Sequence, residues 1–146
     1  MSNKYIDLST LKYLLYDIHK LEDLLDRKRF NDHNKESLDM FLNSTKDFAD
    51  RELFPFIKEM DENPAHHRDG QVFVHKQVET MMKKGGELGF ISASFDYDVG
   101  GMQIPLMAHT AAIYILDAAN NHLPGYAGLT QGAAELIIHF ANKNLI

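Results

Sequence analysis

The chain has 146 residues, of which 45% are hydrophobic and 25% are charged, a balance typical of one globular domain. Its formal charge of -6 disfavours nucleic acid as a partner, because neutralising phosphates requires clustered Lys and Arg. The sequence has no cysteine, which excludes disulfides, thiolate metal sites and cysteine nucleophiles and makes the cytoplasm the expected compartment.

No segment is predicted to target or span a membrane. The start, MSNKYIDLST, lacks the apolar core of a signal peptide. The longest apolar-rich stretch runs from Ile104 to Ala119, is interrupted by polar residues, and is shorter than the roughly 20 residues that a bilayer requires.

Apolar residues recur at helical spacing through the first half of the chain. After Ser9, the predicted N-cap, they predict one or two short helices that end near Arg27. The basic run at 27–29 is flanked by aspartates and is predicted to be a solvated loop. Pro55 is expected to kink the next helix or to start a new one. That second helix presents one apolar face, formed by Leu38, Phe41, Leu42, Thr45, Phe48 and Ala49.

The second half is also helical in pattern. AHHRDGQ is predicted to be a loop, followed by a helix that carries Val74 and Val78 and stops at Gly85 and Gly86, where glycine takes a left-handed C-cap. Two further helices are predicted at about 104–119 and 126–141. Since no stretch longer than about five residues alternates with period two, the predicted fold class is all-α, a bundle of five or six helices without significant sheet.

Gly100 and Gly101 lie between a polar turn and an apolar helix. A glycine pair at this point lets the backbone adopt positive φ and approach neighbouring chain closely. Pro105 falls in the first turn of the following helix, where its missing N–H costs nothing.

The candidate chemical groups do not form a recognisable catalytic set. His66 and His67 are adjacent and therefore point in different directions, so we predict surface histidines rather than a metal site. GGELGF lacks the preceding strand that a phosphate-binding loop requires. Structural roles are also favoured for the remaining candidates, His109, His122, His139, Asp96, Asp98 and Asp117. No catalytic residue and no metal ligand is assigned.

Small residues surround three larger apolar side chains near the last helix. They leave room either for close helix packing or for an apolar ligand channel, and on the residues alone we favour packing. The small residues are Gly125, Ala127, Gly128, Gly132, Ala133 and Ala134, and the larger ones are Leu123, Tyr126 and Leu129.

Four segments, in order, resemble the N-terminal helical domain of the acyl-CoA dehydrogenases. YIDLSTLKYLLYDIHKLEDLL is similar to the helical leader of the 3-methylmercaptopropionyl-CoA dehydrogenase branch, and FADRELFPFIKEMDENP to a family helix with a proline and an acidic exit. GELGFISASFDYDVGGMQIP resembles the passage that usually reads Pro-Glu-Glu-Tyr-Gly-Gly, although Asp96, Tyr97 and Val99 stand where that passage has Pro, Glu and Tyr. GLTQGAAELIIHFAN resembles a branch helix that begins Leu-Thr-Gln-Gly-Ala.

The resemblance implies a helical leader at residues 1–30 and the N-terminal domain at 31–146, with the FAD-binding β-barrel and the glutamate-bearing C-terminal domain absent. It implies FAD as the cofactor of the full enzyme, an acyl-CoA substrate and an electron-transferring flavoprotein as partner. Family members remove the α-proton of the thioester and pass the β-hydride to FAD. By position, the side chains implied to line the acyl chain are Leu123, Tyr126 and Leu129, with Met107 from the preceding helix.

This domain is expected to be inactive alone and to bind no FAD by itself. Without the domains that normally cover it, it is expected to self-associate through an exposed apolar face on the last two helices. Two alternatives stay open: a stand-alone helical module that docks on a partner, and an inert remnant of a truncated gene.

Overall fold

The computed structural model describes residues 4–142 and 144–145. Most of them are helical, which confirms the all-α prediction. The α-helices are α1 (Leu8–Tyr13), α2 (Lys35–Phe48), α3 (Ile57–Glu62), α4 (Gln77–Glu87), α5 (Leu106–Asn120) and α6 (Pro124–Phe140). The one sheet in this part of the chain is a hairpin of β1 (His66–Arg68) and β2 (Gln71–Phe73).

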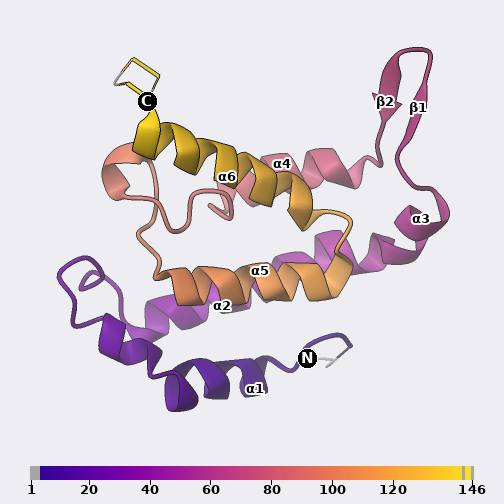
Figure 1. Cartoon of the computed structure of the whole chain (residues 1–146). Coiled ribbons are helices and arrows are strands. Elements are labelled where there is room, and N and C mark those ends of the chain that lie inside the picture. The colour runs from indigo at the N-terminus through magenta and orange to yellow at the C-terminus, as the bar shows by residue number, and fades with distance from the viewer. Residues whose placement is uncertain (1–3, 143, 146) are drawn as a thin grey trace.

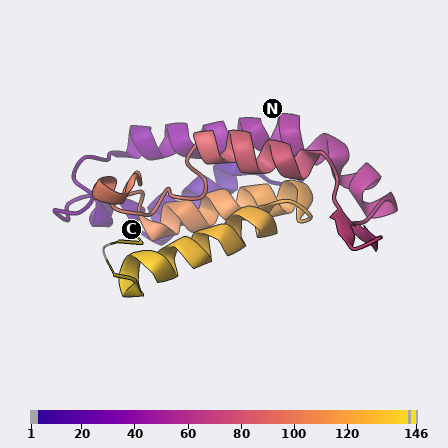
Figure 2. The same cartoon turned by 90° about the horizontal axis from the view of Figure 1, so that it is seen from above.

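The helices lie in three tiers (Figure 1). α1 forms one outer tier, α2 and α5 lie together in the middle, and α4 and α6 form the other outer tier. From above, α2 and α6 lie at opposite sides of the bundle, with α4 and α5 between them (Figure 2). The β1–β2 hairpin projects from the body beyond α3 (Figure 1). The fully buried apolar side chains come from α2, α5 and the segments that connect the helices, and include Leu21, Leu38, Leu42, Leu53, Ile115, Leu116 and Leu123.

The N-terminal segment begins with a side-chain cap on α1. The Asp7 carboxylate accepts from the backbone N–H groups of Ser9 and Thr10, at 2.9 and 3.3 Å, so the predicted Ser9 cap is wrong. A carboxylate two residues upstream offers the first turn a charged acceptor, which is stronger than a hydroxyl. After α1 the chain continues as a π-helical turn, Leu14–Ile18, and a 3-10 turn, Leu21–Leu24.

Two tyrosines fasten this segment to α2 and the turn that follows it. The hydroxyl of Tyr16 donates to Asp39 and that of Tyr5 donates to Asp50, each at 3.0 Å. Burial, and then the hydrogen bond to a carboxylate, raises the pKa of both tyrosines, so each remains a neutral donor. Asp50 also pairs with Lys46 at 2.6 Å, and only 3% of the Lys46 side chain is exposed.

The predicted apolar face of α2 is confirmed, since all six of its residues are buried. Beyond Phe48 the chain leaves α-helical geometry, first as a π-helical turn, Ala49–Leu53, and then as a 3-10 turn, Phe54–Phe56, that contains Pro55. The chain resumes as α3, so the break predicted at Pro55 is confirmed.

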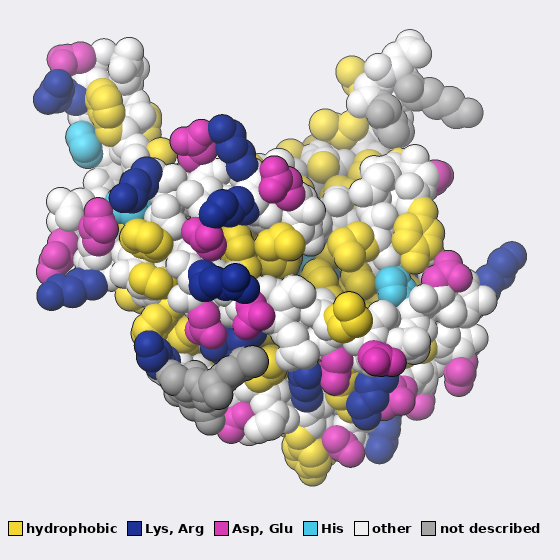
Figure 3. Space-filling view, turned by 180° about the vertical axis from the view of Figure 1, so that it is seen from behind, with side chains coloured by type: hydrophobic (Ala, Val, Ile, Leu, Met, Phe, Trp, Pro, Cys, Tyr) yellow, Lys and Arg dark blue, Asp and Glu magenta, His cyan; other side chains and the backbone are white. Residues whose placement is uncertain are grey.

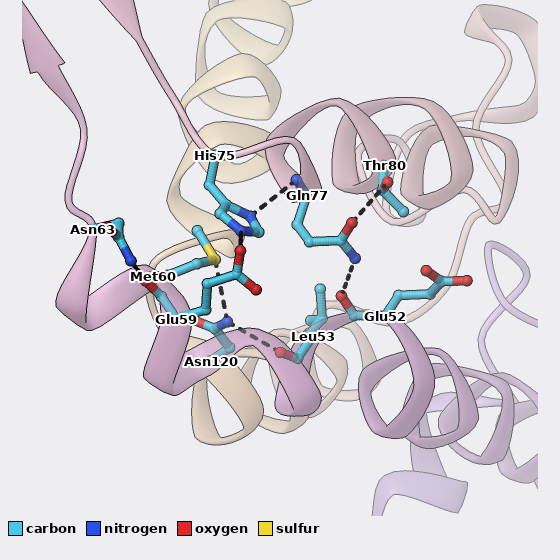
Figure 4. A network of polar contacts seen from close by, with 9 residues as sticks. All are labelled: Glu52, Leu53, Glu59, Met60, Asn63, His75, Gln77, Thr80 and Asn120. Carbon is cyan, nitrogen blue, oxygen red and sulfur yellow. Dashed lines mark hydrogen bonds and ion pairs between the residues drawn. The ribbon is translucent and has the colours of Figure 1, made fainter.

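Side chains from α4 and α5 bind the backbone at this break (Figure 4). Gln77 donates its side-chain amide to the Glu52 carbonyl at 2.8 Å, and Asn120 donates to the Leu53 carbonyl at 3.1 Å. Both side chains are buried. Irregular helix geometry leaves carbonyls without their usual i+4 donors, and buried carbonyls need a partner. The two amides therefore stabilise the break and hold α4 and α5 against it.

Two local predictions are wrong. AHHRDGQ forms most of the hairpin rather than a loop, with Asp69 and Gly70 at φ 52° and 77° in its turn. The next helix, α4, starts at Gln77 and includes Gly85 and Gly86. The left-handed residue beyond its end is Gly89, at φ 80°.

Candidate functional site

The glycine pair shapes the loop between α4 and α5. Gly100 has φ 80°, in the left-handed region that favours glycine. At Gly101, a Cβ atom would lie 2.1 Å from the carbonyl oxygen of Phe95, so no other residue fits without moving the backbone. One glycine supplies the positive φ and the other supplies the close approach, which confirms the sequence interpretation of this pair.

His109 fastens the same loop to α5. Its side chain lies in the core, with 1% of the residue exposed. Nε2–H donates to the Phe90 carbonyl at 3.1 Å, and Nδ1, 3.2 Å from Oγ, accepts from the Ser94 hydroxyl. Burial lowers the pKa of His109, which favours this neutral tautomer. The structural role predicted for His109 is therefore the one it has.

α6 carries two of the predicted acyl-lining residues, Tyr126 and Leu129, and one of its sides is apolar and exposed. It starts at Pro124, where a missing N–H is harmless, directly after the fully buried Leu123. Its inner side contacts α4 and α5. Its outer side presents large apolar residues to solvent: Tyr126, Leu129, Leu136, Ile137 and Phe140.

The four side chains predicted to line an acyl chain do not share one surface. Tyr126 and Leu129 lie on the outer side of α6, with exposed fractions of 38% and 80%. Leu123 is 0% exposed and belongs to the core beneath them. Met107 lies on α5 and borders a different groove, between α5 and the N-terminal segment.

The small residues of α6 divide between its two sides. Ala127 is buried and provides the close packing that we favoured. A Cβ atom added at Gly125, Gly128 or Gly132 would meet nothing within 4 Å, so these glycines make no close contact within the described structure. Packing accounts for the inner side of α6 only.

The other candidate residues are scattered, and His139 is exposed on α6 itself. His66 and His67 are exposed on β1, and His122 lies 4.0 Å from Asp61. Asp96 pairs with Arg29, and partial burial raises the pKa of Asp117. Among residues 4–142 and 144–145, no three His, Cys, Asp or Glu side chains are grouped so as to hold a metal ion.

On the face opposite the viewer of Figure 1, Lys, Arg, Asp and Glu side chains intermingle with apolar side chains (Figure 3). A groove of about 290 Å³ is lined by Met40, Leu88, Phe90 and Met102, among others. His33 closes one side of it by donating Nε2–H to the Met102 carbonyl at 2.9 Å.

The buried polar groups that hold these elements together were not among the predicted residues. Lys46 and Asp50 are four residues apart, a spacing that predicts a helical ion pair. The roles of Gln77 and Asn120 could not be predicted from the sequence. Their partners are backbone carbonyls that the irregular turns after α2 leave without a helical donor.

Neither the segment after β2 nor the start of α6 resembles a flavin-binding turn. A flavin dinucleotide needs a cradle for its pyrophosphate, such as a glycine-rich turn from a strand into a helix or a pair of cationic side chains. β2 leads instead into a short extended segment before α4, and the start of α6 has only the exposed His122 beside it as a basic group. No chemical step is therefore assigned to a flavin on these residues.

The family model described as "Acyl-CoA dehydrogenase, N-terminal domain" matches residues 35–145. The match begins at α2 and extends past α6, and the chain therefore belongs to this family. The segment with α1, Tyr5 and Tyr16 lies before the matched range, and the aspartates that these tyrosines contact lie within it. No curated protein and no solved structure matches the chain. None of the helices in the described part of the chain has the length and apolar character needed to cross a bilayer.

Proposed function

We propose that the chain forms one wall of the slot that holds the acyl-CoA and the flavin in an FAD-dependent acyl-CoA dehydrogenase. Membership of the N-terminal domain family supports the enzyme class. The exposed apolar face of α6 carries the rest of the proposal, because it leaves Leu129 80% exposed on an ordered helix. A surface of this kind fits an apolar ligand or another domain.

Tyr126 and Leu129 are the side chains that we propose to touch the acyl tail. They lie one turn apart on the same side of α6, with the open Gly125 and Gly128 beside them. Without side chains at these glycines, a chain of methylenes can lie close to the helix backbone. Leu123 would support this surface from the core, and Met107 stays a prediction for a part of the tail that extends over α5.

The chain would supply no catalytic base. Glu135, the one carboxylate of α6, accepts from Gln131 at 3.2 Å and is partly buried, and helical spacing places it on another side of α6 from Tyr126 and Leu129. A base must lie within hydrogen-bond reach of the proton that it removes. The base and the flavin site therefore have to come from outside residues 4–142 and 144–145, and we propose that this chain alone does not oxidise acyl-CoA.

The proposed substrate, cofactor and electron acceptor follow from the enzyme class. Acyl-CoA is the proposed substrate, FAD the proposed cofactor of the complete enzyme and an electron-transferring flavoprotein its proposed electron acceptor. Placement in the 3-methylmercaptopropionyl-CoA branch depends on the leader and on the Leu-Thr-Gln-Gly-Ala passage, and it stays a prediction. The cysteine-free sequence fits a cytoplasmic enzyme.

Titration of the ¹⁵N-labelled chain with octanoyl-CoA tests the proposed wall. Because half a slot binds weakly, we expect fast-exchange shifts of amide resonances at Tyr126 and Leu129, and much smaller shifts with CoA alone. Leu129→Glu should remove the tail-dependent shifts. Met40→Glu, which changes another exposed apolar side chain, on α2, should retain them. Equal shifts with CoA and octanoyl-CoA would contradict the proposal.

A further inference from the structure

The loop before α2 is held in shape by its own backbone. In this leader loop, residues 27–33, the N–H of Phe30 donates to the Arg27 carbonyl at 2.8 Å. The N–H of His33 donates in turn to the Phe30 carbonyl at 2.9 Å. The loop ends at Asn34, whose side chain caps α2. Consecutive hydrogen-bonded turns that end in a helix cap make the leader loop a firm support for a neighbouring segment.

The loop that leads into α5 contains a left-handed residue that is not glycine. This glycine loop, residues 94–103, ends at Gln103, which has φ 49°. A residue with a side chain keeps this unfavourable geometry only where the surrounding contacts hold it. The N–H of Gln103 donates to the Phe95 carbonyl at 2.9 Å, and the N–H of Ile104 donates to the Ala93 carbonyl at 2.8 Å. Because α5 begins directly afterwards, the geometry of Gln103 sets the direction in which the chain enters it.

Side chains from both loops cross between them at one end of the bundle (Figures 1 and 2). The Arg29 guanidinium of the leader loop pairs with the Asp96 carboxylate of the glycine loop. In the opposite direction, the side-chain amide of Gln103 donates to the Arg29 carbonyl at 2.9 Å. His33 donates to the Met102 carbonyl, also at 2.9 Å. The leader loop therefore contacts both the left-handed residue and its neighbour.

We propose that the leader loop holds the glycine loop in its left-handed geometry and thereby fixes the start of α5. Arg29 and His33 are positioning residues in this device, because they act on the backbone that precedes the helix. The family model begins at residue 35, so the leader loop lies outside the matched domain and acts on a segment within it. Phe95 is the one buried side chain of residues 94–103. A segment with so few buried contacts can open while the helices stay folded.

Amide hydrogen exchange of the full chain tests the proposal. The reporters are the N–H groups of Gly101 and Ile104, which donate to backbone carbonyls at 2.9 and 2.8 Å. Arg29→Gln and Asp96→Asn should each lower the protection factors of both amides roughly 2–5-fold, as expected for a half-exposed ion pair. Gln103→Met, which removes the donor to the Arg29 carbonyl, should lower them roughly 3–10-fold.

Matched variants and the core amides are the controls. Arg27→Gln and Asp98→Asn make the same changes at exposed neighbouring positions outside these contacts, and they should leave both protection factors unchanged. The amides of Leu42 in α2 and Ile115 in α5, whose side chains are fully buried, should keep their protection in every variant. This result would separate local opening of the glycine loop from a general loss of stability.

The pairing of Arg29 with Asp96 has two further signatures. The double variant Arg29→Gln/Asp96→Asn should lose no more protection than Arg29→Gln alone, because both changes remove one ion pair. Sodium chloride at about 1 M should lower the protection of the reporter amides in the unaltered chain but not in the double variant.

Four outcomes would overturn the proposal. They are unchanged protection in Arg29→Gln and Gln103→Met, additive losses in the double variant, equal losses in reporter and core amides, and similar losses in the control variants. None of these substitutions changes Tyr126 or Leu129, so failure here leaves the proposed function untouched.

Discussion

At the residue scale, the shape of the loop that leads into α5 depends on residues that tolerate no other side chain in their place. Gly101 has the Phe95 carbonyl where a side chain would begin, and His109 uses both ring nitrogens to hold Phe90 and Ser94. The loop follows α4 and precedes the helices that carry the candidate site. Its shape is therefore fixed by backbone contact and by one neutral imidazole.

Substitutions at three glycines separate close approach from backbone conformation. Gly101→Ala should lower the free energy of unfolding by about 3 kcal/mol or more, because the new Cβ overlaps Phe95. Gly100→Ala should cost about 1 kcal/mol through its positive φ. Gly128→Ala, in open space within α6, should instead gain up to about 1 kcal/mol from helix propensity. Urea unfolding followed by circular dichroism measures all three, and equal effects at positions 101 and 128 would contradict this packing.

The buried His109 should make the free energy of unfolding fall as the pH is lowered. Its folded-state pKa is lowered by burial, so the unfolded chain takes up the proton first as the pH falls. The stability contributed by the neutral ring is complete above about pH 6.5 and declines as the pH drops from there through the folded-state pKa.

The stability difference between the unaltered chain and His109→Gln should therefore shrink between pH 7.5 and pH 5.5. Glutamine keeps a donor for the Phe90 carbonyl but cannot be protonated in this range, which makes it the matched variant. Urea titrations at four pH values give the difference directly. A difference that stays constant with pH would exclude His109 as the source.

At the scale of elements, the break after α2 organises the bundle. A π-helical turn, a 3-10 turn and Pro55 redirect the chain between α2 and α3, and buried side-chain amides from α4 and α5 donate hydrogen bonds to the carbonyls of this irregular backbone (Figure 4). The break is therefore a junction of four helices rather than a local defect.

Asn120→Ala should destabilise the junction. It leaves the buried Leu53 carbonyl without its side-chain donor, and we expect a loss of about 1–3 kcal/mol in the free energy of unfolding. Asn121→Ala, at the exposed neighbouring position, should change stability by less than about 0.5 kcal/mol. The prediction fails if chemical denaturation shows the two variants to be alike.

Some of these helices and strands could be predicted from the sequence alone, and others could not. The apolar face of α2 and the break at Pro55 were predictable, because a helical period and the geometry of proline act locally. The hairpin was missed because His66–Arg68 and Gln71–Phe73 are short and wholly exposed, so burial imposed no alternation on them. Asp69-Gly70 was the available signal, since this dipeptide favours tight hairpin turns.

Candidate site residues were harder to predict than helices. Resemblance pointed to Tyr126 and Leu129, which do share an exposed face, but also to Leu123, which is buried on the inner side. Exposure depends on which side of α6 packs against α4 and α5, and α6 is apolar on both sides, so its sequence pattern cannot assign an inside. Tertiary contacts make that choice.

At the scale of the whole molecule, charged and apolar side chains share the surface. The rear face mixes acidic and basic side chains with apolar ones (Figure 3), and the outer side of α6 and the groove between α5 and the N-terminal segment leave further apolar surface uncovered. These surfaces fit the part that we propose for this chain in an acyl-CoA dehydrogenase, in which the base and the flavin site come from elsewhere.

The most direct test of this assignment is flavin retention and turnover by purified residues 1–146. The protein is mixed with FAD, separated from free cofactor by gel filtration, and assayed for dye reduction with short-, medium- and long-chain acyl-CoAs. We predict a colourless protein without turnover, because orienting a base and a flavin against the substrate can account for roughly 7–11 kcal/mol of a barrier, and we propose that this chain supplies neither group. A yellow protein, or turnover that Glu135→Gln abolishes, would show that the chain is a complete enzyme.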